Sequence, residues 1–194
     1  MPITINGDGT ITGLSVGGLP DGSVDNDTLA SNAVTTAKLH NDAVTTSHMP
    51  SGSVIQVKYA QTQSNFTQTS SSYQNFSNLN VSITPTSSSN LLVFQYTMIV
   101  RVRENSSHGA FAWIAISDDD GSSYLAENYH RNSDYGGSGT DLDCSACGYA
   151  IKTAGSTSAR TYKMYAKLGD GDSYEINPAS SQNNSVVTVM EISA

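Results

Sequence analysis

The chain is poor in charge and in long apolar runs. Charged residues make up 13 % of its 194 positions, and with only nine Lys and Arg the net charge is −8. A surface this acidic repels phosphate backbones and anionic lipid headgroups, so we expect neither nucleic-acid binding nor membrane insertion. No stretch approaches the roughly 20 apolar residues that span a bilayer. The N-terminus has no basic region and no apolar signal core, so we expect synthesis in the cytoplasm without a signal peptide.

Cysteine is scarce as well. The two cysteines form a single C-x-x-C motif, Cys144 and Cys147. A thioredoxin-like motif needs a strand–helix context, and a zinc site needs two more ligands at suitable spacing. Neither is present, so we expect two thiols or one short-loop disulfide, and the sequence leaves that choice open.

Candidate metal ligands are few and poorly spaced. Asp118 to Asp120 precede Gly121, but a calcium loop requires further oxygen ligands in register, which the following serines do not provide. Asp170 and Asp172 flank Gly171 in the same way. His40 and His48 could form metal rings in an oligomer, but they occupy different positions of the repeat described below. We predict acidic hairpin tips, solvated histidines and no bound metal or cofactor.

Catalytic side chains occur without a catalytic pattern. Glu104, His108, Asp134 and Asp141 are the acid–base candidates, and no serine lies in a nucleophile-elbow motif. Glycan hydrolysis would need two carboxylates across a groove, for which the sequence gives no specific signal. We therefore predict that the protein is not an enzyme.

What the chain does contain is an apolar residue at every fifth position near its N-terminus. The series lies within decapeptide repeats at 22–31, 32–41 and 42–51. A step of five rotates away from the starting face of a helix and falls on the opposite face of a strand. We therefore predict that the chain bends between apolar residues and presents each to an axis shared with other copies of itself. The predicted axis residues are Leu14, Leu19, Val24, Leu29, Val34, Leu39, Val44, Met49 and Val54.

The repeats divide the chain into three predicted parts. Residues 1–13 form an attachment arm, in which the Asn-Gly-Asp-Gly sequence at 6–9 is a hairpin signal. Residues 14–51 form a repeat shaft, and its Thr-Thr-Ala-Lys-Leu sequence is compatible with one helical turn. Residues 52–194 form a head, in which apolar residues alternate with a period of two.

The head has the pattern of an all-β domain. The clearest strand covers 94–102, and other long strands are expected at 111–116, 161–168 and 186–192. Shorter strands are expected near 55–59, 64–69, 79–84, 122–128, 148–152 and 174–176, separated by clusters of turn residues. The last strand is apolar enough to be central in its sheet. We predict an antiparallel, jelly-roll-like β-sandwich preceded by the repeat shaft, assembled as a homotrimer.

Several short motifs, taken in their order along the chain, carry a resemblance to a known family. The sequence from Ile5 to Val24 and the Ala-Val-Thr-Thr-Ala-Lys-Leu repeat at 33–39 resemble short virion appendage proteins of tailed bacteriophages, especially cyanophage-like ones. The head motifs Gly-Ser-Val-Ile-Gln-Val (52–57), Ser-Ile-Thr-Pro (82–85), Thr-Tyr-Lys (161–163) and Thr-Val-Met-Glu-Ile (188–192) resemble the same proteins. The resemblance implies a trimeric tail fibre or similar appendage with a β-rich knob. It implies no catalytic residues.

One segment of the head has the composition of a binding loop. Between 124 and 140, tyrosines alternate with Ser, Gly and Asn, a mixture that supplies contact area and hydrogen bonds with little loss of entropy. An arginine in this segment is suited to a carboxylate or phosphate on a surface glycan. A long polar loop, or tyrosines packed between subunits, would have the same composition. The predicted receptor-contact residues are Tyr124, Tyr129, His130, Arg131 and Tyr135.

The sequence thus predicts a structural protein located in the virion, a short trimeric tail fibre with a receptor-binding head. The alternative is a capsid decoration, or cement, protein, in which residues 1–13 would hold the major capsid protein rather than the baseplate. A cellular trimeric adhesin or lectin is disfavoured because we find no export signal.

Overall fold

The computed structural model describes residues 4–5, 7, 11–12, 24, 27, 29–103, 111–118, 121–131, 142–178 and 184–194. The chain forms two compact units, Met1–Thr45 and Thr46–Ala194. The second unit, which we call the head unit, contains the β-sandwich. The predicted catalytic candidates at 104, 108, 134 and 141 lie outside the described residues, as do Leu14, Leu19 and Tyr135.

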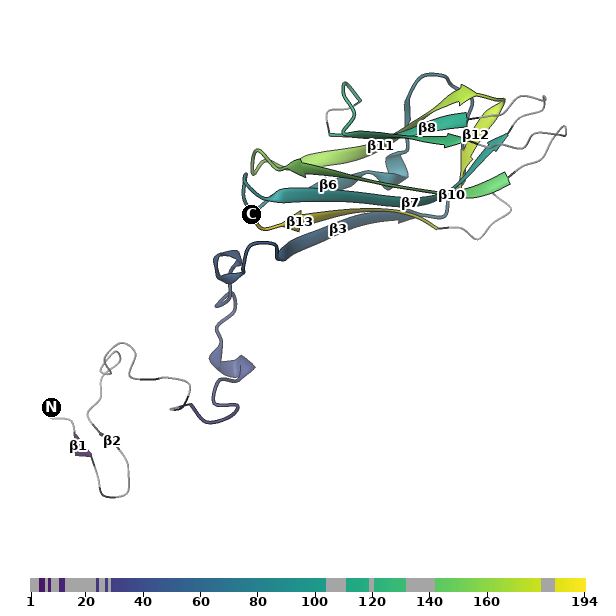
Figure 1. Ribbon diagram of the computed structural model, residues 1–194. Coiled ribbons are helices and arrows are strands. Elements are labelled where there is room, and N and C mark those ends of the chain that lie inside the picture. Colours follow the sequence, from purple (N-terminus) through teal and green to yellow (C-terminus); the bar gives the residue numbers. More distant parts are fainter. Residues whose placement is uncertain are drawn as a thin grey trace. The chain divides into compact units, whose positions relative to one another are not determined.

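The described regular structure consists of β-strands and short 3-10 turns (Figure 1). The elements are β1 (Thr4–Ile5), β2 (Ile11–Thr12), η1 (Thr36–Lys38), η2 (Thr46–His48), β3 (Val54–Thr62), β4 (Phe66–Gln68), β5 (Gln74–Asn75), η3 (Ser77–Leu79), β6 (Val81–Ile83), β7 (Leu91–Arg103), β8 (Phe111–Ser117), β9 (Ala126–Arg131), β10 (Leu142–Thr153), β11 (Arg160–Asp170), β12 (Ser173–Ile176) and β13 (Ser185–Ile192). β1 and β2 pair antiparallel across the predicted hairpin signal.

From Leu29 to Val54, a turn or a 3-10 turn separates each apolar residue of the series from the next. Residues 30–33, 40–43 and 50–53 each close a turn through a backbone hydrogen bond from the last residue to the first. The 3-10 turns η1 and η2 fill the steps between these turns. The predicted bending of the chain is therefore confirmed for this stretch.

The third residue of each closed turn has a left-handed backbone. The φ angles are 64° at Asn32, 65° at Asp42 and 88° at Gly52. Asn, Asp and Gly are the residues that enter this region at low cost, which explains their recurrence at the same place in each repeat.

The head unit is a sandwich of two antiparallel sheets. The larger sheet has the order β3–β13–β7–β12–β4, with β10 on the other side of β7. The smaller sheet has the order β5–β11–β8–β9, and β6 pairs with β11 beside β5. The predicted all-β sandwich is confirmed, and the last strand, β13, is central between β3 and β7 as expected.

Alternating side chains from the two sheets fill the core. Along β7 every second residue from Leu92 to Val102 is buried, and the facing strand β11 buries Tyr162, Met164, Ala166 and Leu168. The rings of Phe94 and Tyr162 meet across the sandwich with centroids 4.0 Å apart. This contact joins the central strands of the two sheets.

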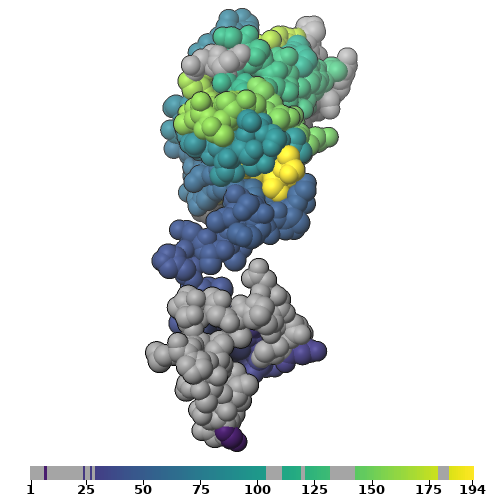
Figure 2. Space-filling view, turned by 90° about the vertical axis from the view of Figure 1, so that its left-hand side faces the viewer, coloured from purple at the N-terminus to yellow at the C-terminus, as the bar shows by residue number. Residues whose placement is uncertain are grey.

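The C-terminus closes the beginning of the head unit. Ser193 accepts a backbone hydrogen bond from Gly52 and donates one to Ser53, both at 2.9 Å. Its hydroxyl also donates to the carbonyl oxygen of Pro50. Figure 2 shows the last residues in yellow against the blue segment that leads into β3. The end of the chain thereby fixes the segment that enters the sandwich.

Two strands differ from the sequence expectation. The strand expected near 122–128 begins later and forms β9, Ala126–Arg131, so part of the predicted binding loop is a sheet strand. The strand expected at 148–152 is the end of the much longer β10. Small residues such as Ala146 and Gly148 face inward along β10, and they weakened the alternation that identifies a strand.

Candidate binding face on the smaller sheet

The outer face of the smaller sheet carries a cluster of aromatic side chains. The register places Tyr129 of β9 opposite Trp113 of β8, and Trp113 opposite Lys167 of β11. The adjacent outward row contains Glu127, Ala115 and Tyr165, of which Ala115 and Tyr165 are buried and Glu127 is exposed. The inward residues of β8, Ala112, Ile114 and Ile116, are buried in the core. We call the outward surface the aromatic face.

A lysine lies among the rings of this face. The Lys167 ammonium is 4.3 Å from the centroid of the Tyr73 ring and 5.8 Å from that of Trp113. The Tyr73 hydroxyl donates a hydrogen bond to the Glu127 carboxylate. Burial raises the pKa of Tyr73, and the hydrogen bond to Glu127 raises it further, so the phenol stays protonated near neutral pH. The Lys167 ammonium thus lies against two π-systems, the geometry of a cation–π contact.

Further ring contacts extend the cluster in both directions. Tyr124 lies against Tyr73 at 4.3 Å and against Tyr165 at 5.8 Å between centroids. At the other end Tyr129 contacts Phe111 at 5.0 Å and Trp113 at 5.3 Å. These offset and edge contacts fix the rings relative to one another and leave a platform that needs little ordering on binding.

At one end of the platform, the Phe111 ring lies close to the backbone of Gly169. A Cβ added to Gly169 would lie 1.9 Å from Cε2 of Phe111. The Phe111 ring therefore packs over bare backbone on β11, which lets it reach Tyr129. A β-bulge between Leu168 and Asp170 produces this local irregularity.

The aromatic face is locally basic in an acidic protein. Lys163, Lys167 and Arg131 share the outward side of β11 and β9, against two acidic residues, Glu127 and Asp170, at outward positions of the same strands. Aromatic rings beside cations favour ligands with flat apolar patches and carboxylate or phosphate groups. Acidic saccharides combine these properties.

The predicted contact residues are distributed unequally. Tyr124 and Tyr129 lie on the aromatic face, and Arg131 is exposed at the end of the same strand. His130 alternates to the inner side of β9, where its Nε2 is buried without a hydrogen-bond partner and burial lowers the pKa of the ring. Tyr135 lies outside the described residues.

Five members of the cluster, including Phe111 and Tyr165, were not among the predicted contact residues. Tyr73, Trp113 and Lys167 come from segments far apart in the chain and meet only through strand pairing. Trp113 belongs to a run that is apolar on both sides, which predicts a central strand covered on both faces. β8 is central in its sheet, between β11 and β9, but Trp113 is partly exposed on the outer face.

The other candidate groups are engaged or exposed. The Asp118 carboxylate lies 2.6 Å from the Lys152 ammonium and 3.5 Å from the Arg160 guanidinium, so it is already engaged in two salt bridges. Cys144 and Cys147 are both free thiols. No group of three or more metal-binding side chains, and no helix long and apolar enough to cross a membrane, occurs among the described residues.

The described axis residues all lie at the surface of the single chain. Their exposed fractions range from 42 % at Met49 to 66 % at Val44. The trimer axis itself stays a prediction. The residues concerned are Val24, Leu29, Val34, Leu39, Val44, Met49 and Val54.

No protein family matches the sequence, and no curated protein matches it. Among solved structures, a mutant VP2 protein of infectious bursal disease virus, in derived T=1 particles, is similar at 12 % identity with a TM-score of 0.32. The similarity covers 71 % of this chain and 39 % of that one. At this TM-score it carries no argument about function.

Proposed function

We propose that this chain is a structural protein of a bacteriophage virion, a short trimeric tail fibre whose heads bind an acidic surface glycan of the host. The observation that carries the proposal is the aromatic face, a rigid set of rings around Lys167 on an exposed sheet. In this proposal residues 1–13 attach the fibre to other virion proteins, and the repeats join three copies.

The repeat segment supports the proposal through its exposed apolar residues. From Val34 to Val54 each axis residue follows a turn or a 3-10 turn, and all the described axis residues are exposed in one chain. Repeats of this kind bury their apolar side against neighbours, and further copies of the same repeat have the matching period.

The strand order of the head supports the architecture expected of such a protein. The two sheets contain β3–β13–β7–β10 and β6–β11–β8–β9, and among these eight strands the chain changes sheet at every connection except the one from β8 to β9. This is the order of a jelly roll, an arrangement used in capsid and lectin domains. Fold alone does not define function, so the proposal depends on the aromatic face.

Three copies of one face also suit recognition of a repeated surface polymer. A single ring-stacking and ion-pair contact is weak, whereas linked copies bind with avidity because later contacts form at a high effective concentration. A polysaccharide presents the same unit many times, so it can occupy several heads of one fibre.

The binding experiment uses Trp113, the single tryptophan of the chain. Purified protein is titrated with polygalacturonate as an acidic probe and dextran as a neutral one, while tryptophan emission is recorded. We expect polygalacturonate to shift the emission, and Lys167→Met to weaken its binding about tenfold, since a desolvated cation–π or ion-pair contact contributes on the order of 1–2 kcal/mol.

Lys58→Met is the matched control, because Lys58 is exposed on the larger sheet. Equal loss of binding in the two lysine variants would contradict a specific role of the aromatic face. The absence of any emission change with either polymer would contradict glycan binding there.

The capsid decoration protein is the second candidate, because the jelly-roll strand order of the head also occurs in capsid domains. Immunogold labelling of intact particles, together with copy number by quantitative mass spectrometry, separates the two. A few copies at the tail support the fibre. Many copies spread over the capsid support the decoration protein and contradict the fibre.

A further inference from the structure

The larger sheet has an outer face of different character. Four outward residues from each of β3, β13, β7 and β10 lie in register and form four rows across the sheet. Tyr59, Tyr149 and Ile151 are the most exposed of them, at 67 %, 71 % and 60 %. We call this surface the aliphatic face. Its rows are Val54–Ile192–Leu91–Thr153, Val57–Met190–Val93–Ile151, Tyr59–Thr188–Gln95–Tyr149 and Gln61–Val186–Thr97–Cys147.

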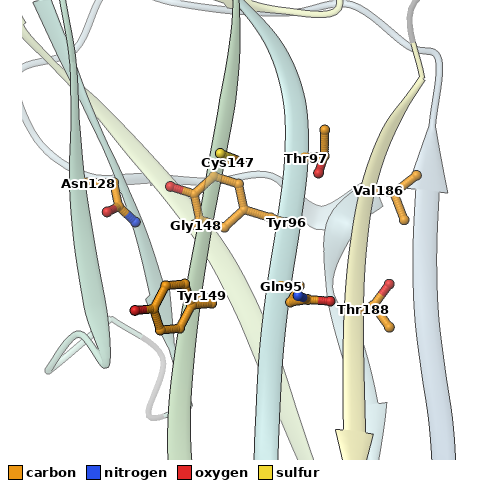
Figure 3. A pocket seen from close by; sticks show the side chains of 9 residues that line it. All are labelled: Gln95, Tyr96, Thr97, Asn128, Cys147, Gly148, Tyr149, Val186 and Thr188. Atoms are coloured by element: carbon orange, nitrogen blue, oxygen red, sulfur yellow. The ribbon is translucent and has the colours of Figure 1, made fainter.

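Two of these rows border a shallow hollow. Figure 3 shows Tyr149, Gln95 and Thr188 in one row, with Cys147, Thr97 and Val186 in the next. The hollow has a volume of about 670 Å³. Gly148, Tyr96 and Asn128 also line it, and Tyr96 itself is buried at 2 % exposure. Such a surface can receive projecting side chains.

The aliphatic face contains no ionisable acid or base among the sixteen positions, apart from the tyrosine and cysteine side chains. Charges begin farther along the sheet, where Arg101 forms a bidentate pair with Asp143 at 2.6 and 3.1 Å. Arg103 and Glu175 lie in the same region, 2.9 Å apart. At this end of the strands, ion pairs thus follow directly on the neutral rows.

The lack of charge decides which partner fits. Two copies of a protein with a net charge of −8 repel each other, and the repulsion is smallest where the contact surface is neutral. A basic partner would be complementary to an acidic surface, which this face does not offer. The face therefore suits another copy of the same chain.

The sequence also runs from the predicted axis directly into this face. Val54 is the last residue of the five-residue series and the first residue of β3, where it lies opposite Ile192. A register shift between Glu191 and Ile192 leaves Ile55 outside the pairing and brings Val54 into the outermost row. The apolar series of the repeats therefore continues into the aliphatic face.

The size of the patch predicts a modest contact. Four strands and about eight residues span roughly 19 Å by 25 Å, on the order of 450 Å². That is about half of the roughly 800 Å² per partner in a stable interface. The face alone would associate weakly, but copies already joined by the repeats would hold it at an effective concentration near the millimolar range.

We infer that the aliphatic face of the larger sheet is the surface through which heads of neighbouring copies contact one another. The inference rests on the proposed oligomer, and it places the aromatic face of the smaller sheet on the outside of the assembly. The occupant of the face is a second copy of this chain.

Cys147 provides a probe within the face. It is exposed in the single chain, whereas Cys144 is partly buried and burial raises the pKa of its thiol. In the full-length protein carrying Cys144→Ser, we expect a maleimide to label Cys147 at least tenfold more slowly than in the same protein with Tyr59→Lys and Ile151→Lys. Tyr129→Lys, an exposed substitution on the other sheet, should leave the slow labelling unchanged. Circular dichroism checks that all variants are folded.

The oligomeric mass, measured on the same samples, separates this inference from the proposed function. If the parent protein is a trimer and Cys147 reacts as fast in it as in the Tyr59→Lys/Ile151→Lys variant, the inference is wrong and the repeat-based trimer stands. If the parent is a monomer with fully reactive Cys147, both fail. Slow labelling that persists when Val34→Lys and Val44→Lys are introduced supports the head contact and contradicts assembly by the repeats.

Discussion

The Asn177 side chain donates a hydrogen bond from Nδ2 to the carbonyl oxygen of Thr62 at 2.8 Å, across 115 positions of sequence. In the larger sheet, β3 and β4 follow one path and β13 and β12 follow the neighbouring path. The bond lies at the level where both paths are interrupted. β3 gives way to β4 beyond Thr62, and β12 ends just before Asn177. The unbroken strand β7 pairs with β13 up to Thr97 and with β12 from Val100 onward.

Asn177 satisfies the polar groups freed at this interruption. Its Oδ1 accepts a hydrogen bond from the Ser185 hydroxyl at 2.7 Å, and its backbone N–H donates to Ile99 at 3.0 Å. Its φ of 49° lies in the left-handed region, which asparagine tolerates better than most residues. The residue is 1 % exposed, so lost partners would not be replaced by water.

Asn177→Ala should therefore destabilise the head unit strongly. Each buried group left without a partner costs about 1–3 kcal/mol, and left-handed alanine costs roughly 1–2 kcal/mol more. Asn177→Gly removes the same side-chain bonds without the backbone strain, so it should unfold at a higher urea concentration than the alanine variant. Equal midpoints for alanine and wild type would contradict this role.

Glu191 forms a second buried polar centre. Its Oε1 accepts hydrogen bonds from Asn90 at 2.7 Å and from the Thr86 backbone at 2.7 Å, and its Oε2 accepts one from Gln56 at 2.6 Å. Burial by itself would raise the pKa of this carboxyl. The hydrogen bonds from Gln56, Asn90 and Thr86 outweigh burial and hold the pKa below its usual value.

Because the pKa of Glu191 is lowered in the folded state, the free energy of unfolding depends on pH. Because the unfolded state binds the proton more readily, the carboxylate stabilises the fold above its unfolded pKa of about 4.3, and that contribution is lost as pH falls through the lower folded pKa. Glu191→Gln should cost roughly 1–3 kcal/mol near neutral pH, since an amide N–H₂ would face donors. The difference from wild type should shrink in acid. A difference that is constant with pH in urea unfolding curves would contradict the assignment.

Gly148 tests the packing beneath the aliphatic face. A Cβ at this position would lie 2.4 Å from Nδ2 of Asn128 and 2.5 Å from Cε1 of Tyr96. Tyr96 is buried, so its ring has little room to move. We expect Gly148→Ala to lower the free energy of unfolding by about 1–3 kcal/mol, as other overpacked cores do. Ser145→Ala, on an exposed position of the same strand, serves as the control and should change it little.

The strands could be predicted wherever one side of the strand is buried. In β7 the alternation of Phe94 and Tyr96 with polar or smaller residues predicted the strand, and in β13 the apolar residues on both sides predicted a central strand. β10 was only partly found, because Ala146 and Gly148 are small on the inside while Tyr149 and Ile151 are exposed. That reversal of the usual pattern follows from Tyr96, which fills the inner space.

The candidate site was less predictable than the fold. Tyr124 and Tyr129 were found by local composition, but Tyr73, Trp113 and Lys167 join them only through the register of β11 with β5 and β8. A sequence gives the face of each strand, not which rows become neighbours. His130 was predicted as a contact residue because a loop was expected there. In β9 successive side chains point to opposite faces, so His130 points inward.

The central claim is self-association, and the molar mass of the full-length protein tests it most directly. Multi-angle light scattering on the size-exclusion peak at micromolar concentration should give three times the chain mass of 20.5 kDa. Deleting residues 14–51 should weaken the oligomer and leave the β-sheet circular dichroism of the head. A full-length protein that elutes at 20.5 kDa over this concentration range would contradict the account.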